Sequence, residues 1–131
     1  MKNKKKASGP IFTGVELCDG VPPALFNVFL QNSTDRTRTV KVVVEEWGQY
    51  QLPATGPIQI IFDQTFTIPA NSVGQVSLPP DPPILRRVLV EGDIQHKNDP
   101  GIEAMVLVYG NTRTDPVAYI PWNDFFEIKQ K

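Results

Sequence analysis

The sequence has little cysteine and histidine, the two residues that most often carry metal or redox chemistry. Its 131 residues include one cysteine, Cys18, and one histidine, His96. A single cysteine excludes a disulfide framework within the chain. Cys18 is therefore predicted to be a buried free thiol or, alternatively, one half of a bond between subunits. A zinc site needs further His or Cys ligands at suitable spacing, so His96, in the polar turn 95–101, is predicted to be a solvated loop residue.

The short motifs of nucleotide binding and hydrolysis are also absent. The sequence contains no G-x-S-x-G, no P-loop and no G-x-G-x-x-G. Its turn carboxylates are spread along the chain among prolines and glycines, where aspartate accepts backbone N–H bonds, and they form no converging calcium cluster. We therefore expect no catalytic residue, no metal, no cofactor and no enzymatic activity.

Long apolar runs are missing as well. No stretch approaches the roughly 18 apolar residues of a membrane-spanning helix. The N-terminal lysines resemble the start of a secretory signal, but Gly14, Glu16 and Asp19 interrupt the apolar run of about 7–15 residues that a signal peptide needs. We therefore expect a protein made in the cytoplasm without a signal peptide, with no membrane partner, and exported, if at all, by cell lysis or another route.

Proline and period-two alternation are abundant instead. The chain has 13 prolines, about twice the average share, and proline belongs to loops and strand ends. Apolar residues alternate with polar ones in segments bounded by turn residues, which is typical of strands. About eight short strands at roughly ten-residue spacing indicate an all-β fold, an antiparallel β-sandwich or jelly roll. The predicted strands are 24–32, 38–47, 57–68, 72–78, 85–94, 102–109, 116–120 and 124–128.

The alternation also predicts which side chains share a face. In 57–68, a bulge near Asp63-Gln64 is expected to bring the second half of the strand back into register with the first. The residues placed on one face there are Ile58, Ile60 and Phe62, joined by Phe66 and Ile68. In the predicted strand 38–47 the core candidates are Val40, Val42 and Val44. In the predicted strand 85–94 they are Leu85, Val88 and Val90.

The first 23 residues differ from the rest, so we divide the chain into an N-terminal arm, 1–23, and a β-sandwich domain, 24–131. The arm begins with a basic tip that consists of Lys2, Lys4, Lys5 and Lys6. The net charge of the chain is −1, but without these four lysines nine basic residues face 14 acidic ones, a net charge of −5. A basic arm on an acidic body suits head-to-tail self-association that salt weakens; solubility is the alternative role of the lysines.

The segment 11–18 of the arm alternates like a strand. Its odd positions form an apolar face, and an extended segment of this kind can add to the edge of a sheet. The segment is either the first strand of its own sandwich or a strand donated to a neighbouring subunit, in which case the contact is heterologous and propagates. The predicted interface residues are Ile11, Phe12, Thr13, Val15, Leu17 and Cys18.

The lysine tip and the aromatic residues bear on two other kinds of binding, to nucleic acid and to a small ligand. The lysine tip has no interleaved aromatics and sits on an acidic body, so we expect no nucleic-acid partner. Aromatic residues on strands usually pack in a core or an interface; as an alternative function, they would form the ligand surface of a monomeric β-sandwich binding module. These residues are Trp47, Tyr50, Trp122, Phe125 and Phe126. A phage or capsid accessory protein is a further alternative.

Four segments carry a family resemblance: 28–34, 40–44 with Trp47 following, 66–72 and 106–110. Residues 24–110 resemble small β-proteins of spore-forming Firmicutes, the exosporium-associated and endospore-appendage fibre subunits, which are jelly-roll domains with an N-terminal connector. The resemblance implies a structural, self-assembling subunit without catalytic residues. Its partners would be further copies of itself, in a head-to-tail homopolymer, and other spore-surface proteins. Its location would be the spore surface or an extracellular fibre.

The chain departs from this family in its cysteine content. The better-known appendage subunits use several cysteines to join their connectors covalently, and this chain has only Cys18. Strand complementation through the arm is therefore the linkage that we expect.

Overall fold

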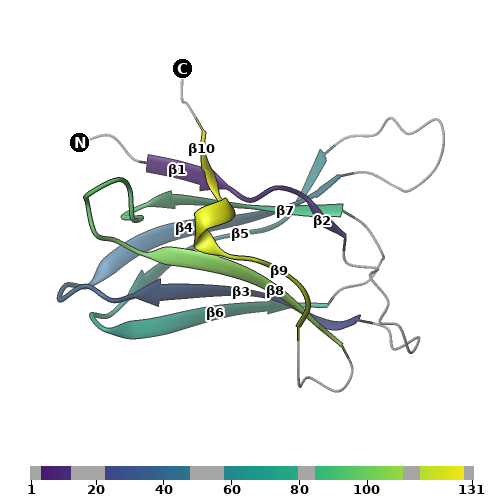
Figure 1. The fold of residues 1–131 in the computed structure, drawn as a ribbon, viewed down its shortest axis with the longest axis horizontal. Coiled ribbons are helices and arrows are strands. Elements are labelled where there is room, and N and C mark those ends of the chain that lie inside the picture. The colour runs from purple at the N-terminus through teal and green to yellow at the C-terminus, as the bar shows by residue number, and fades with distance from the viewer. Residues whose placement is uncertain (1–3, 13–22, 48–57, 80–84, 111–115, 129–131) are drawn as a thin grey trace.

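The computed structural model describes residues 4–12, 23–47, 58–79, 85–110 and 116–128. Within these ranges the chain folds into two packed antiparallel β-sheets, which confirms the predicted all-β sandwich (Figure 1). A short 3-10 turn, Trp122–Asp124, follows the ninth strand. The strands are β1 (Lys4–Ala7), β2 (Ile11–Phe12), β3 (Pro23–Asn32), β4 (Arg38–Trp47), β5 (Ile58–Ile68), β6 (Ser72–Leu78), β7 (Leu85–Gly92), β8 (Glu103–Gly110), β9 (Pro116–Ile120) and β10 (Phe126–Glu127).

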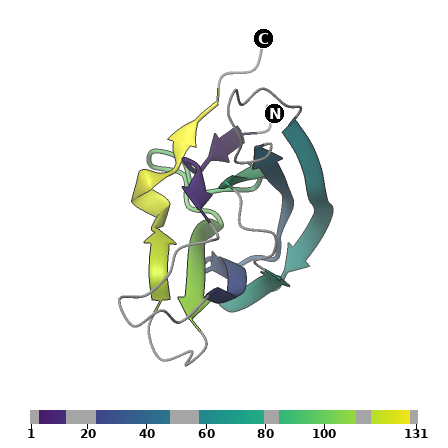
Figure 2. The ribbon, with the colours of Figure 1, turned by 90° about the vertical axis from the view of Figure 1, so that its right-hand side faces the viewer.

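The larger sheet has the order β10-β1-β7-β4-β5, and β2 pairs with β7 beside β1. The smaller sheet has the order β6-β3-β8-β9. Successive strands mostly change sheets, as from β3 to β4, from β5 to β6 and from β6 through β7 to β8, which is the winding typical of a jelly roll. Figure 2 shows the two sheets end-on, with β5 and β6 along one side of the sandwich.

The core lies between the two sheets and consists mainly of β-branched residues. In β4, Val40, Val42 and Val44 are fully buried, whereas Thr39 and Lys41 lie on the outer face. Valine suits this position because its branched side chain packs well on a pleated surface. The core-facing prediction is confirmed for these three valines and for Val88 and Val90 of β7. Leu85 alternates to the other face of β7 and is half-buried, so its placement in the core was wrong.

The predicted bulge in β5 exists but lies elsewhere. Val44 pairs with Phe62 and Glu45 pairs with Ile60, so the extra residue is Ile61 rather than Asp63 or Gln64. One extra residue turns every side chain beyond it to the opposite face. Ile60 therefore points outward beside Glu45, and the prediction that Ile58 and Ile60 share a face with Phe62 was wrong.

Candidate functional site: the seat of the N-terminal strands

The predicted arm residues fall partly within the described chain. Lys4, Lys5 and Lys6 belong to β1, and Ile11 and Phe12 form β2. These two strands lie along one edge of β7 (Figure 1). We call this edge of β7 the arm seat. The remaining predicted residues, Lys2, Thr13, Val15, Leu17 and Cys18, lie outside the described ranges.

The arm pairs with the arm seat in an antiparallel ladder that runs the length of β7. Lys4 pairs with Gly92 and Ala7 with Leu89, and further along Ile11 pairs with Arg86. Ala7 is fully buried and Ile11 is 7% exposed, within the core cluster. The seat therefore holds its strands by apolar burial as well as by backbone bonds.

A short irregularity separates β1 from β2. Three residues, Ser8 to Pro10, stand opposite two on β7, so the arm contains one extra residue there. The Ser8 N–H donates to the Val88 carbonyl at 2.8 Å, and the Val88 N–H donates to the Ser8 hydroxyl oxygen at 3.0 Å. Ser8 is fully buried, so its hydroxyl satisfies a buried backbone donor where the regular ladder is interrupted.

The far side of β1 is covered by the C-terminal end of the chain. Lys6 pairs with Glu127 and Ala7 with Phe126 of β10, and the Ile128 N–H donates to the Lys5 carbonyl at 2.9 Å. β10 follows Trp122 and Phe125, which are 8% and 5% exposed and pack with each other at 5.0 Å between ring centroids. A strand anchored in the core thus closes over the arm.

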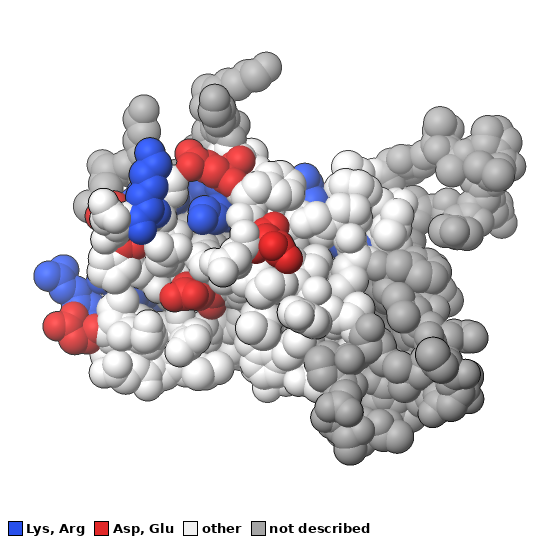
Figure 3. Space-filling view, viewed as in Figure 1, with Lys and Arg blue, Asp and Glu red and all other residues white. Residues whose placement is uncertain are grey.

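The described lysines of the tip meet specific partners. The Lys4 ammonium donates to the Asp99 carboxylate at 2.7 Å. This hydrogen bond and the positive charge beside it lower the pKa of Asp99 below its ordinary value of 3.8. The Lys6 ammonium lies 4.8 Å from the centroid of the Trp122 ring, within the range of a cation–π contact. Charges of both signs are visible along the upper and left-hand parts of Figure 3, whereas the region below, over β6, is mostly uncharged.

The loop between β7 and β8 completes this end of the seat. The Trp122 indole N–H donates to the Gln95 amide oxygen at 2.8 Å, and His96 Nδ1 lies 3.6 Å from a Glu127 carboxylate oxygen. The side chain of His96 is only 15% exposed. The prediction of a solvated loop histidine was therefore wrong, because the fold brings Glu127, far away in the sequence, next to His96.

A buried arginine next to β2 was not predicted from the sequence. Arg86 is 2% exposed; its Nε and Nη2 donate to Glu46 at 3.3 and 3.1 Å, and its Nη1 donates to the Pro79 carbonyl at 2.8 Å. Its guanidinium lies 5.0 Å from the centroid of the Phe26 ring. The alternation of the strand could have predicted its burial, because Arg86 lies two and four residues before Val88 and Val90 and so shares their core-facing side. The ion pair closes the end of the core on which β2 lies.

The predicted aromatic residues are not gathered into one ligand surface. Trp122 and Phe125 are buried in the core, whereas Phe126 is 49% exposed on β10. Trp47 lies on the outer face of β4, with the Arg87 guanidinium 5.3 Å from its ring centroid. Tyr50 lies outside the described residues. The described residues of this set therefore lie at separate places, two in the core and two on the surface of different strands.

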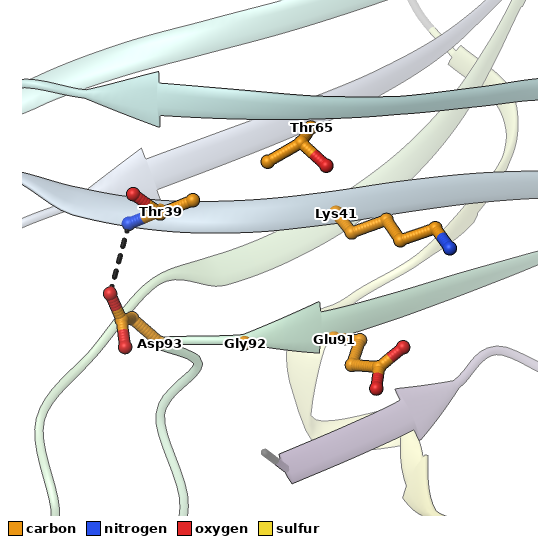
Figure 4. A pocket seen from close by; sticks show the side chains of 6 residues that line it. All are labelled: Thr39, Lys41, Thr65, Glu91, Gly92 and Asp93. Atoms are coloured by element: carbon orange, nitrogen blue, oxygen red, sulfur yellow. Dashed lines mark hydrogen bonds between the residues drawn. The ribbon is translucent and has the colours of Figure 1, made fainter.

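A shallow hollow of about 390 Å³ on the outer face of the larger sheet is lined by polar residues. Figure 4 shows the Asp93 carboxylate accepting a hydrogen bond of 3.0 Å from the Thr39 N–H. Gly92 has φ 128°, and a Cβ there would lie 2.8 Å from the Thr39 carbonyl oxygen, so only glycine fits this approach. The remaining lining residues are Lys41, Thr65 and Glu91.

Within the described ranges, no group of three or more His, Cys, Asp or Glu side chains is arranged to hold a metal ion. In the same part of the chain, no helix has the length and apolarity needed to cross a membrane. No family model, curated protein or solved structure matches the chain. The arm seat, with its buried strands and closing C-terminus, is the candidate site that the geometry supports best.

Proposed function

We propose that the protein is a structural subunit that assembles head to tail by giving its N-terminal strands to the arm seat of a neighbouring copy. The observation behind this proposal is the way this chain's own β7 holds the arm, because an identical arm from a neighbour would fit the same seat. Residues 4–12 lie on one edge of β7 with Ala7, Ser8 and Ile11 buried. They form an N-terminal element that fills a seat on the sandwich.

The energetics favour a filled seat whichever copy fills it. Without β1 and β2, the edge of β7 would expose unpaired N–H and C=O groups, and such an edge invites pairing with another strand. The same residues in a neighbour's arm satisfy the same groups. The choice between a chain's own arm and its neighbour's is then set by geometry and concentration.

The connection between arm and domain permits exchange. Ten residues, 13–22, join Phe12 to Pro23, and ten residues span at most about 35 Å when extended. A neighbour's seat within that distance is in reach. Because the donated arm and the seat are different surfaces, each copy both gives and receives, and the contact propagates into a filament or closes into a ring.

The charge distribution supports the same direction of assembly. Lys4 and Asp99 form the exposed ion pair of the seat, with exposed side-chain fractions of 32% and 74%. An exposed ion pair of this kind adds little affinity. The attraction between the Asp99 carboxylate and the lysines of an incoming arm nevertheless orients the arm and accelerates its approach. The resemblance to spore-appendage subunits supports a spore-surface fibre as the assembly that forms.

The test compares the full-length protein with Ile11→Asp. A carboxylate at this buried position opposes seating of the arm, so we expect light scattering and negative-stain microscopy to show polymers of the full-length protein and only small species of the variant. Tyr119→Asp, at a position on β9 that is 62% exposed, is the control and should polymerise normally. Far-UV circular dichroism checks that both variants fold.

Two results would contradict the proposal: a full-length protein that stays monomeric at high concentration, or an Ile11→Asp variant that polymerises like the parent. Closed rings in place of filaments would favour a phage or capsid accessory protein, the alternative function in which the same contact closes on itself.

A further inference from the structure

The second edge of the larger sheet, formed by β5, is open. Among the described strands β5 pairs only with β4, and it is the longest strand, with 11 residues. Most of its residues are exposed, and none before Ile68 is buried. The side of β5 that faces away from β4 therefore presents a long row of backbone groups with no described strand paired to it (Figure 2).

The first half of this edge is apolar because of the bulge at Ile61. Ile58, Ile60 and Ile61 are 56%, 60% and 37% exposed. In a strand without the bulge, Ile58 and Ile60 would alternate with Phe62 and face the core. The bulge instead turns both side chains to the outer face beside Glu45 and Trp47. Bulges that redirect side chains are features of function more often than defects.

The edge is weakly protected against pairing. Natural edge strands are kept apart by prolines, inward-pointing charges or lysines. β5 contains no proline and one charged residue, Asp63, and Lys41 lies 3.7 Å from the Asp63 carboxylate. The apolar side chains and the open backbone together mark a contact surface.

The chemistry of this surface specifies its partner. A row of alternating N–H and C=O groups is satisfied by another extended strand, and the isoleucines require apolar neighbours. A second β5 provides both. Asp63 is the one charge of β5 and its middle residue, so a two-fold axis at Asp63 would place the two carboxylates opposite each other. An axis near Ile60 instead brings the isoleucines of the two copies together and keeps the Asp63 carboxylates apart.

We propose that β5 is a contact edge for a second copy of this chain, whose own β5 pairs with it antiparallel and extends the larger sheet across a two-fold axis. This edge and the arm seat lie on opposite sides of the same sheet, with β10 and β5 at the two sides of the molecule in Figure 2. A copy can therefore make both contacts at once. The β5 contact does not depend on exchange of the arm.

The test is a double variant, Ile58→Lys with Ile60→Lys, made in the Ile11→Asp background so that exchange of the arm does not contribute to association. It is compared with that background, as the parent, by sedimentation velocity over a range of concentrations. Two lysines on each copy repel across the pairing, so we expect the dissociation constant of the dimer to rise at least tenfold. The matched control is Val73→Lys, which places one lysine on β6, the adjacent edge of the smaller sheet, at a position that is 66% exposed. The control should dimerise within twofold of the parent.

Hydrogen exchange locates the contact in the unmodified protein, even if the double variant fails to fold. The β5 amides that point away from β4 should exchange slowly in concentrated protein and quickly in dilute protein. Fast exchange of these amides at all concentrations would overturn the proposal, even if the arm drives polymerisation, because arm exchange leaves the β5 edge open. In the Ile11→Asp background, a parent that shows no mass increase with concentration, or a folded double variant that associates like that parent, would also overturn it.

Discussion

The two edges of the larger sheet differ in what covers them. On one side, β1 and β2 cover β7, and β10 covers β1. Buried side chains, an interstrand serine hydroxyl and an aromatic–cation contact hold these strands there. On the other side, β5 is paired along one flank and exposes three isoleucines. The comparison shows that the same sheet closes one edge with strands near both ends of the chain and leaves the other without a partner strand among the described residues.

The largest effect is expected beneath the covered edge. Arg86→Ala leaves the Glu46 carboxylate without its buried partner, and loss of one member of a buried ion pair costs about 3–5 kcal/mol of unfolding free energy. The neighbouring variant Arg87→Ala is the control, because Arg87 pairs with Glu45 at 3.0 Å while 22% exposed, against 2% for Arg86. Its loss should therefore cost less unfolding free energy than the loss of Arg86. Urea unfolding measures both. Equal losses would mean that burial does not separate the two arginines.

A second prediction compares the loss of unfolding free energy when one isoleucine from each edge is truncated. Ile11→Ala removes a side chain that is 7% exposed on the covered edge, and a truncation of this kind costs about 2–5 kcal/mol. Ile60→Ala removes one that is 60% exposed on the open edge, and we expect a change within about 0.5 kcal/mol.

Thermal or urea unfolding of dilute protein decides this prediction, because dilution keeps any β5 contact from contributing. A large loss for Ile60→Ala in dilute protein would show that the open edge is part of the packed core. A negligible loss for Ile11→Ala would show that the arm is not held by burial.

The smallest effect is expected from pH at the tip of the covered edge. Lys4 lowers the pKa of Asp99, so the pair contributes stability above the ordinary carboxyl pKa of 3.8 and loses it as the pH falls through the lowered value. In Lys4→Met the pKa of Asp99, measured by NMR titration, should return toward 3.8. The parent and the variant should converge in stability at acid pH. An unchanged Asp99 titration would show that the two residues do not pair in solution.

Much of the fold was predictable because alternation is a local property. The bounds predicted for the strands 38–47, 72–78 and 116–120 agree with β4, β6 and β9, since each is a clean period-two segment between turn residues. The prediction was less accurate at 124–128, where a 3-10 turn precedes a two-residue strand. Short segments of this kind form through contacts with distant strands, and their own sequence contains little signal.

The candidate site was predictable only in part. An apolar, strand-like segment within the arm was visible in the sequence, and Ile11 lies in such a strand. The bulge at Ile61 was misplaced because alternation reveals a change of phase only where the two faces of a strand differ in polarity, and residues 60–62 form a continuous apolar run. Arg86 and His96 were misjudged because their partners, Glu46, Pro79 and Glu127, are supplied by other segments.

The sequence by itself determined that this chain forms strands, that one face of most of them is apolar, and that its basic tip stands apart from an acidic body. The tertiary structure decided which edges of the larger sheet are covered and which is open. The physical reason is that alternation specifies the two faces of a strand, whereas its edges carry identical backbone groups whatever the residues. Their pairing depends on which distant segments the fold brings alongside.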